Sequence, residues 1–206
     1  IRTSNLVSPS SKGVLAPGSV IGILGGGQLG RMLALAAARL GFRCHIYSDV
    51  SGPAFDVAAS HIQARYNDEK ALVEFAKPLA VATYEFENIP LQTVEFLNRY
   101  VPVRPGAKAL ACAQDRINEK NLARTLGSHT APYAQIDNLN DLVMVIKKEI
   151  PVPCVLKTRR FGYDGKGQSK ILKNSDLENA WHAIKNQPSI LEGFVDFKRE
   201  ISVVAA

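Results

Sequence analysis

The feature that most constrains the fold is a short apolar segment followed directly by a cluster of glycines. Residues 19–24 are mainly apolar and β-branched, GGGQLG follows at 25–30, and the alanine- and leucine-rich residues 31–40 end at Gly41. This order predicts a strand, a tight turn and a helix that stops at a glycine. Because residues 42–47 predict a second strand, the chain is expected to open with a βαβ unit in a parallel sheet.

The alternation of strands and helices continues towards residue 100. The apolar pattern predicts, in chain order, a helix at 68–76, a strand at 79–83 and a short helix at 93–98. Residues 101–105 then carry two prolines, which indicate a transition to a linker. We therefore expect a small, doubly wound, Rossmann-like α/β domain at residues 18–106, preceded by a disordered leader at 1–17.

The pattern changes after Gly106. It predicts, in chain order, helices at 107–126 and 139–148, strands at 154–158 and 168–172, a helix at 175–186, and strands at 189–194 and 200–204. Two strands joined by a glycine-rich connection, then a helix and further strands, favour an α+β domain with an antiparallel sheet. We expect this second domain to cover residues 107–206 and to be incomplete, because the last residues predict a strand without a closing turn.

Charge and cysteine usage disfavour several classes of protein. The net charge is +6, but the Lys and Arg residues are scattered and lack the interleaved aromatic residues of a base-stacking surface, and an anionic small molecule would explain the excess as well as a nucleic acid would. No apolar run approaches the roughly 20 residues of a membrane span. Cys44, Cys112 and Cys154 are odd in number and far apart, which disfavours a disulfide framework or a zinc site and favours a reducing, cytoplasmic setting.

The first glycine cluster admits two interpretations. The spacing G-x-G-x-x-G at 25–30 lets the backbone approach a phosphate at a helix N-terminus, and Asp49 lies where a dinucleotide-binding fold places its ribose-binding acid. That combination would bind NAD or FAD. The same glycines are also required for a sharp turn and for close packing of helix on strand, in which case the turn only helps to form a substrate pocket.

A second glycine cluster gives the stronger signal for a ligand. The sequence VLKTRRFGYDGKGQ at 155–168 places Lys157 at the end of a buried strand, where an ammonium group is costly unless it meets an anion. Gly162, Gly165 and Gly167 supply backbone amides that suit the binding of phosphates. The lysine precedes the glycines, so this is not a Walker loop. Taken alone, the segment is equally compatible with an exposed basic hairpin.

A third segment favours a nucleotide over a hairpin. The sequence ILEGFV at 190–195 predicts a strand with one acid, and Glu200 begins the next predicted strand. The first of these strands could run past an adenine ring and offer backbone groups to its edge, while Glu192 or Glu200 reaches the ribose hydroxyls. The simpler alternative is an edge strand with a solvated carboxylate.

In this order, these segments resemble the ATP-grasp superfamily and, within it, the N5-carboxyaminoimidazole ribonucleotide synthetase family. The resemblance runs from about residue 18 to residue 206 and rests on GGGQLGRM at 25–32, TYEFEN at 83–88, Asp115-Arg116, and the segments 157–168 and 192–203. It implies a Rossmann-like pre-ATP-grasp domain followed by the first part of an ATP-grasp domain, with the carboxy-terminal part missing.

The resemblance also implies an activity. The implied enzyme is a ligase of purine biosynthesis that uses ATP to activate bicarbonate, through carboxyphosphate, and carboxylates 5-aminoimidazole ribonucleotide with release of ADP and phosphate. Tyr163, Asp164 and Lys166 are implied to be catalytic, and Gln28 and Glu85 to line the ribonucleotide pocket. The implied ATP-binding residues are Arg116, Lys157, Gly162, Tyr163, Asp164, Gly165, Lys166, Gly167, Gln168, Glu192, Gly193, Phe194, Val195 and Glu200.

Other implied features fall outside this sequence. The Mg²⁺ ligands of the family are expected downstream of Ala206, so no metal site is expected in the chain and the 206 residues alone are expected to lack ligase activity. Family members are usually homodimers. Two alternatives stay open, which are a nicotinamide-dependent oxidoreductase built on the first glycine cluster and Asp49, and a nucleotide-binding module without catalysis. Within the superfamily, TYEFEN and FGYD favour the aminoimidazole enzyme over a formate-using transformylase or a biotin carboxylase.

Overall fold

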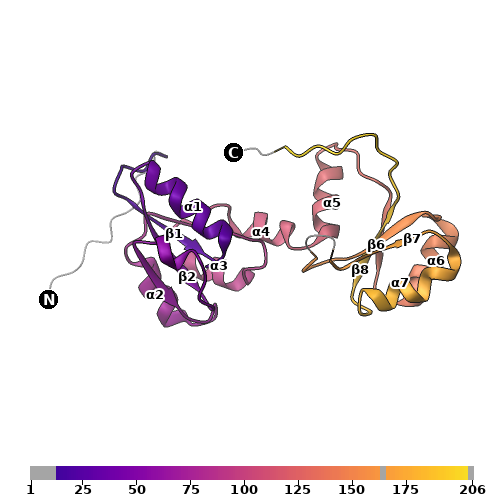
Figure 1. The fold of residues 1–206 in the computed structure, drawn as a ribbon, viewed down its shortest axis with the longest axis horizontal. Helices are drawn as coiled ribbons and strands as arrows, with labels where there is room; N and C mark the ends of the chain where they lie inside the picture. Colours follow the sequence, from indigo (N-terminus) through magenta and orange to yellow (C-terminus); the bar gives the residue numbers. More distant parts are fainter. Residues whose placement is uncertain (1–12, 163–165, 204–206) are drawn as a thin grey trace. The chain divides into compact units, whose positions relative to one another are not determined.

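The computed structural model describes residues 13–162 and 166–203, which belong to two compact units (Figure 1). The first unit runs from Ile1 to Ala111 and the second from Cys112 to Ala206. Residues 1–12 of the leader predicted at 1–17 lie outside the described residues. The predicted domain limits on either side of Gly106 stay predictions. In the described part of the chain, no helix combines the length and the apolar composition needed to cross a membrane.

The first unit is a parallel sheet with helices on both faces. Its strands follow the order β3-β2-β1-β4, and each neighbouring pair is parallel. This confirms the predicted doubly wound α/β fold, although β3, which is more exposed than the other strands of this sheet, was not predicted. The elements are β1 (Val20–Leu24), α1 (Gln28–Arg39), β2 (Arg43–Ser48), the 3-10 helix η1 (Phe55–Val57), β3 (Ser60–Gln63), α2 (Glu69–Ala76), β4 (Val81–Tyr84) and α3 (Leu91–Leu97).

The alternation of side chains along β1 and β2 builds a core on each face of this sheet. Ile23 and Ile46 are buried on the face that α1 covers, where Ala34 packs against them. Leu24 and Tyr47 point to the opposite face and are buried with apolar residues of α2 and α3. Both faces are therefore covered, as a parallel sheet requires.

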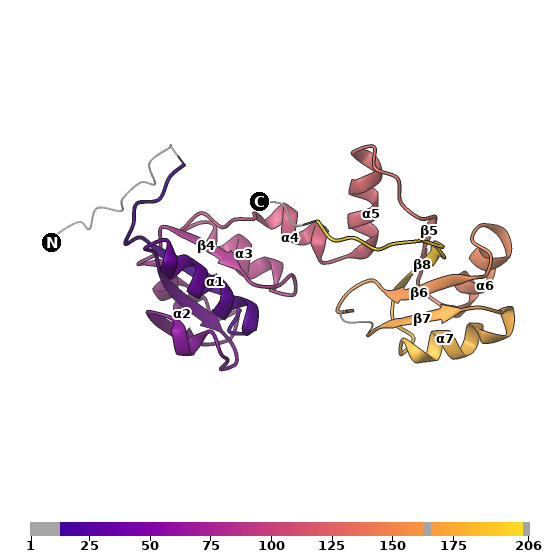
Figure 2. The same ribbon diagram turned by 45° about the horizontal axis from the view of Figure 1, so that its top comes forward.

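The second unit is an antiparallel sheet with two helices packed on one face (Figure 2). Its strand order is β5-β8-β6-β7, which confirms the predicted α+β class. The helix α4 (Ala107–Ala113) spans the division between the units. The elements that follow are α5 (Arg116–Thr125), β5 (Tyr133–Ile136), α6 (Leu139–Lys148), β6 (Cys154–Thr158), β7 (Gln168–Ile171), the 3-10 helix η2 (Asn174–Asp176), α7 (Leu177–Ala183) and β8 (Ser189–Gly193).

The register of β6 and β8 decides which side chains of this sheet face the core. Leu156 pairs with Leu191, and both are fully buried in a cluster with apolar residues of α6 and α7. Lys157 and Glu192 are the next residue on each strand. Because successive side chains of a strand point to opposite faces, both lie on the face that α6 and α7 do not cover.

Two predicted elements are wrong. The helix predicted at 107–126 is two helices, because Asp115 is extended and its carboxylate accepts a hydrogen bond from the amide of Ile117 at 2.9 Å, which begins α5. The strand predicted at 200–204 is absent over its described residues, 200–203. Ile201 and Val203 are exposed, and extended residues form a strand only when their backbone groups pair with another strand.

We expect Leu142→Ala to lower the free energy of unfolding of the second unit by about 2–5 kcal/mol, because Leu142 on α6 is fully buried in its core. Met144→Ala on the same helix is the matched control, since its half-exposed side chain should change the free energy by no more than about 0.5 kcal/mol. The fluorescence of Trp181, the only tryptophan, reports on this core during urea unfolding. Equal losses in the two variants would contradict the assignment of this core.

Candidate functional site

Lys157 and Glu192, both predicted to bind nucleotide, contact each other on the face of the second sheet opposite α6 and α7. Nζ of Lys157 donates a hydrogen bond to Oε2 of Glu192 at 3.0 Å. Lys120 of α5 brings a second ammonium group to the same oxygen at 3.3 Å. The side chains of Lys157, Glu192 and Lys120 are 27%, 11% and 20% exposed. We call these three residues the ion cluster.

The ion cluster carries one negative and two positive charges, so it has an excess positive charge in a partly buried place. Removing a charge from water is costly, and electrostatic interactions are stronger where the surroundings are less polar than water. An anion that reached these ammonium groups would therefore be held more strongly than by lysines in open solution. This fits the sequence-based prediction that Lys157 meets a phosphate.

Asp115 joins the start of α5 to the end of β6. Its carboxylate caps α5 and also accepts hydrogen bonds from Nε and Nη2 of Arg159, which makes a bidentate ion pair. Burial alone would raise the pKa of Asp115, but the hydrogen bonds from Arg159 and from the backbone, together with the charge of Arg159, hold the pKa below its usual value. The hydrogen bonds to Asp115 likewise raise the pKa of Arg159.

The residues on either side of Asp115 bind the first residues of the glycine-rich loop. Gln114 accepts a hydrogen bond from Arg160 at 3.0 Å, and Nη2 of Arg116 donates to the carbonyl oxygen of Gly162 at 3.0 Å. We call residues 159–162, held in this way, the loop base. Nε of Arg116 is buried and has no hydrogen-bond partner among the described residues. A buried donor without a partner costs about 1–3 kcal/mol, so Nε of Arg116 is available for a ligand.

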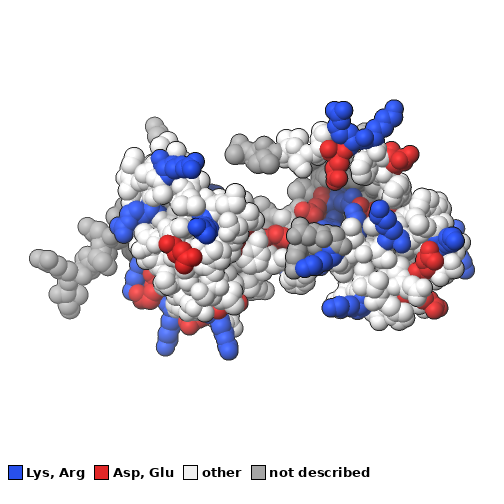
Figure 3. All heavy atoms as spheres, in the orientation of Figure 1, with Lys and Arg blue, Asp and Glu red and all other residues white. Residues whose placement is uncertain are grey.

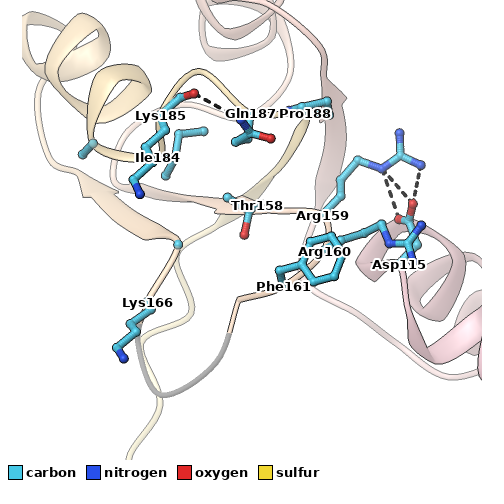
Figure 4. Close-up of a pocket in the computed structure, with 12 residues that line it drawn as sticks. Asp115, Thr158, Arg159, Arg160, Phe161, Lys166, Ile184, Lys185, Gln187 and Pro188 are labelled. Carbon is cyan, nitrogen blue, oxygen red and sulfur yellow. Dashed lines mark hydrogen bonds and ion pairs between the residues drawn. The ribbon is translucent and has the colours of Figure 1, made fainter. Parts of the chain in front are cut away.

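A cavity of about 800 Å³ lies beside the loop base, on residues of the second unit only (Figure 4). Figure 4 shows Ile184, Lys185 and Pro188 on one side of it, and Lys166 on the other. Thr158 also lines it, whereas Lys157 and Glu192 do not. Since Thr158 follows Lys157 on β6, its side chain belongs to the other face of the sheet. The cavity and the ion cluster are therefore separate features of the second unit.

The first glycine cluster already binds a carboxylate of this chain. Glu85, which follows β4, accepts hydrogen bonds from the backbone amides of Gly27, at 2.6 Å, and Gly30. A Cβ added at Gly25 would lie 2.4 Å from the side chain of Glu85, and Gly25 has a φ of +113°, so a side chain there is doubly disfavoured. Glu85 thus occupies the amides at the start of α1 to which a dinucleotide would present its phosphates.

The structure brings together some of the predicted ligand-binding residues. In the second unit it joins Lys157 to Glu192 and Arg116 to Gly162, and it places Gly167 and Lys166 on the cavity. In the first unit Glu85 is half-buried at the glycine turn, whereas Gln28 is exposed at the first position of α1. Tyr163, Asp164 and Gly165 lie outside the described residues.

The remaining predicted residues are more exposed. Gln168 pairs with Lys157 across β6 and β7, and Gly193 ends β8. Phe194, Val195 and Glu200 follow β8 and are exposed, and Glu200 is not on a strand. The predicted strand that was to carry Glu200 towards a ribose is thus not formed.

Sequence reasoning missed Lys120 and the partners of the loop base. The spacing of four residues between Arg116 and Lys120 was a usable signal, because residues four apart lie on the same face of a helix. The pairing of Asp115 with Arg159 joins residues 44 positions apart, and no local pattern indicates it. Among the described residues, no group of three or more His, Cys, Asp or Glu side chains could hold a metal ion.

The charged side chains on the face shown in Figure 3 are spread over both units, with Lys and Arg interspersed with Asp and Glu. The sequence-based observation that the positive charge is scattered therefore also describes this face. The cations that come together with a specific geometry are those of the ion cluster and the loop base.

Two family models match the chain in succession. Residues 19–114 match the ribonucleotide synthetase preATP-grasp domain, and residues 121–206 match the ATP-grasp domain. The chain is 46% identical over 195 residues to an N5-carboxyaminoimidazole ribonucleotide synthase of Brucella melitensis, a match that covers 93% of this chain and 54% of that protein. The chain spans about half the length of the curated N5-carboxyaminoimidazole ribonucleotide synthases that it matches.

Solved structures agree with these matches. The crystal structure of an ADP complex of an N5-carboxyaminoimidazole ribonucleotide synthetase has a TM-score of 0.84 and 38% identity, over 90% of this chain and 49% of that one. A synthase of Aspergillus clavatus in complex with ADP and 5-aminoimidazole ribonucleotide has a TM-score of 0.78 and 26% identity, over 88% of this chain and 48% of that one. Both the sequence and the fold of this chain are thus similar to the same group of proteins.

We expect Asp115→Asn to remove the ion pair with Arg159 while keeping the helix cap, because asparagine caps helices as well as aspartate does. The pKa of Asp115 is lower in the folded protein than in the unfolded chain, where it is about 3.9. The ion pair therefore stabilises the fold at pH values above about 3.9, and this stabilisation is lost as the pH falls towards the folded-state pKa. The free energy of unfolding of the wild type should exceed that of the variant by about 1–3 kcal/mol at pH 7, and this difference should disappear below about pH 4. Urea unfolding followed by Trp181 fluorescence from pH 7 to pH 3 measures it, and a difference that is independent of pH would refute the ion pair.

Proposed function

We propose that this chain belongs to the ATP-grasp superfamily as a homologue of the N5-carboxyaminoimidazole ribonucleotide synthetases, and that the protein in which it occurs is an ATP- and bicarbonate-dependent ligase. It would carboxylate 5-aminoimidazole ribonucleotide to N5-carboxyaminoimidazole ribonucleotide in purine biosynthesis, releasing ADP and phosphate. The observation that carries this proposal is the ion cluster, in which Lys157 and Glu192 meet on the face of the second sheet opposite α6 and α7.

The proposed chemistry has two steps. A bicarbonate oxygen attacks the γ-phosphorus of ATP, ADP leaves, and carboxyphosphate is formed. The exocyclic amine of the ribonucleotide then attacks the carboxyphosphate carbon, the amine loses a proton, and phosphate leaves. Phosphoryl transfer chiefly needs positioning and neutralisation of charge. Lys157, the buried Nε of Arg116 and backbone amides near Gly162 and Gly167 are the groups of this chain that would supply both.

Other residues would bind the acceptor and the carboxyl donor. We place Tyr163, Asp164 and Lys166 near the reacting groups, as catalytic residues, and Gln28 and Glu85 at the ribonucleotide. Lys166 lines the cavity beside the loop base, but that cavity is separate from the ion cluster, so we do not assign the substrates to it. The other ATP-binding residues proposed from the family resemblance keep their roles, with Gln168 and Gly193 on the sheet and Phe194, Val195 and Glu200 following it.

The described residues do not fit a magnesium site, since no group of three carboxylate, imidazole or thiol side chains comes together. The Mg²⁺ that accompanies ATP would take its protein ligands from residues that follow Ala206. We further propose a homodimer and a cytoplasmic location. The three free cysteines Cys44, Cys112 and Cys154 fit a reducing compartment.

The structure weakens the alternative of a nicotinamide-dependent oxidoreductase. Such an enzyme would need the amides of Gly27 and Gly30 for the phosphates of its cofactor, and Glu85 accepts hydrogen bonds from both. A dinucleotide phosphate would have to displace this carboxylate or be repelled by it. A nucleotide-binding module without catalysis remains compatible with the ion cluster, because binding and turnover need the same cations.

Titration with MgATP and, separately, with NADH tests the nucleotide preference. We expect the complete protein in which these residues occur to bind MgATP and to bind NADH at least about tenfold more weakly, because Glu85 holds the amides at the start of α1. Isothermal titration calorimetry measures both affinities. A higher affinity for NADH than for MgATP would favour the oxidoreductase and contradict the proposed ligase.

Phosphate release tests the reaction itself. The complete protein should release phosphate from ATP only when both bicarbonate and 5-aminoimidazole ribonucleotide are present, and the 206-residue chain alone should release none. Lys157→Met should lower kcat/KM for ATP by about 100-fold, the usual size for losing one charge-stabilising donor. Lys147→Met, an exposed lysine on α6, should leave it unchanged. Nucleotide binding by the complete protein without any such release would support the binding module instead.

A further inference from the structure

Oε2 of Glu192 contacts two lysines, and this shared contact affects how readily Lys157 can bind a phosphate. Nζ of Lys157 lies 3.0 Å from this oxygen and Nζ of Lys120 lies 3.3 Å from it. Two ammonium groups that contact one oxygen repel each other, so each is held less firmly than it would be in a simple pair. Neither Lys157 nor Lys120 has the full counter-charge of Glu192 to itself.

We propose that Lys120 is a positioning residue of the nucleotide site, which acts by drawing Glu192 away from Lys157 and so leaves Lys157 able to bind a phosphate. The idea rests on the proposed use of ATP. Without Lys120, Glu192 and Lys157 would form an isolated pair with no net charge. An arriving phosphate would then have to break that pair before it could bind Lys157.

The position of Lys120 on α5 makes this role specific. Lys120 lies one turn after Arg116, on the same face of the helix. The start of α5 is held to the end of β6 by the ion pair of Asp115 with Arg159 and by the backbone hydrogen bond from Arg116 to the carbonyl oxygen of Arg159 at 3.1 Å. The Lys120 side chain therefore approaches Glu192 from an element that is fixed relative to the sheet.

The surroundings of Lys120 favour a partly buried, oriented ammonium group. The side chain is 20% exposed, and its Nζ lies 5.8 Å from the centre of the Tyr133 ring, within the range of a cation–π interaction. Tyr133 pairs with Glu192 across β5 and β8, so both side chains project from the same face of the sheet. Lys120 therefore lies near both this aromatic ring and the carboxylate, although Arg124 is closer to the ring, at 3.9 Å from its centre.

The test measures the affinity for MgATP of the complete protein in which these residues occur. We expect Lys120→Met to weaken binding about tenfold, the size of a coupling between contacting charged side chains. Lys120→Arg, which keeps the charge, should retain affinity close to that of the wild type. Lys147→Met on α6 is the matched control for the loss of one positive charge and should leave the affinity unchanged.

The decisive comparison is made in a Glu192→Gln background. If Lys120 acts through Glu192, adding Lys120→Met to Glu192→Gln should have little further effect, because no carboxylate is left to hold Lys157. If Lys120 contacts the phosphates directly, the same tenfold loss should appear in both backgrounds, and the positioning role is overturned. Thermal unfolding of each variant separates a loss of folded protein from a loss of affinity.

The outcomes distinguish this inference from the function on which it rests. A wild-type protein that does not bind MgATP would overturn both. A wild type that binds MgATP, together with a Lys120→Met variant that binds it equally well, would overturn only the role of Lys120. A loss in Lys120→Arg as large as in Lys120→Met would also overturn it, since the charge would then not be what matters.

Discussion

The position of α5 against the second sheet depends on the contacts of the Asp115 carboxylate. It begins α5 by accepting a hydrogen bond from the amide of Ile117, and it fixes the end of β6 by pairing with Arg159. One side chain thereby sets the direction of a helix and its position against a strand. Arg116 and Lys120 project from that helix, so their approach to Gly162 and to Glu192 follows from the same contact.

Each unit carries a carboxylate of its own chain where a phosphate could bind, and the two differ in how firmly they are held. Glu85 accepts hydrogen bonds from two backbone amides that are fixed by the start of α1. Those donors cannot move away without unwinding the helix, so Glu85 closes the glycine turn to an anion. Glu192 is instead held by two lysine side chains, which can rotate. The second arrangement can exchange its internal carboxylate for a ligand at much lower cost.

Local patterns predicted most of the elements and little of their contacts. The apolar run at β1, the glycine turn and the helix after it were readable because each depends on neighbouring residues. The break between α4 and α5 was missed because 107–126 contains no glycine or proline. Asp115, a residue type that favours helix N-caps, was the local signal for it, whereas the pairing of Asp115 with Arg159 joins residues far apart in the chain. β3 (SHIQ) and β5 (YAQI) were missed because each holds only one β-branched residue, so their pairing with β2 and β8 defines them better than their composition does.

In the candidate site, too, individual residues could be predicted from the sequence, whereas the contacts between them could not. Lys157 and Glu192 were each predicted from the chemistry of their own segment, yet their contact depends on the register of β6 against β8. Because side chains alternate along a strand, a slip of one residue would bring Leu191 onto the face opposite α6 and α7 and turn the carboxylate of Glu192 into the apolar core. Burying a carboxylate there would cost several kcal/mol, as would exposing the leucines that fill the core. The apolar residues that pack against α6 and α7 therefore select the register that assembles the ion cluster, although none of them belongs to it.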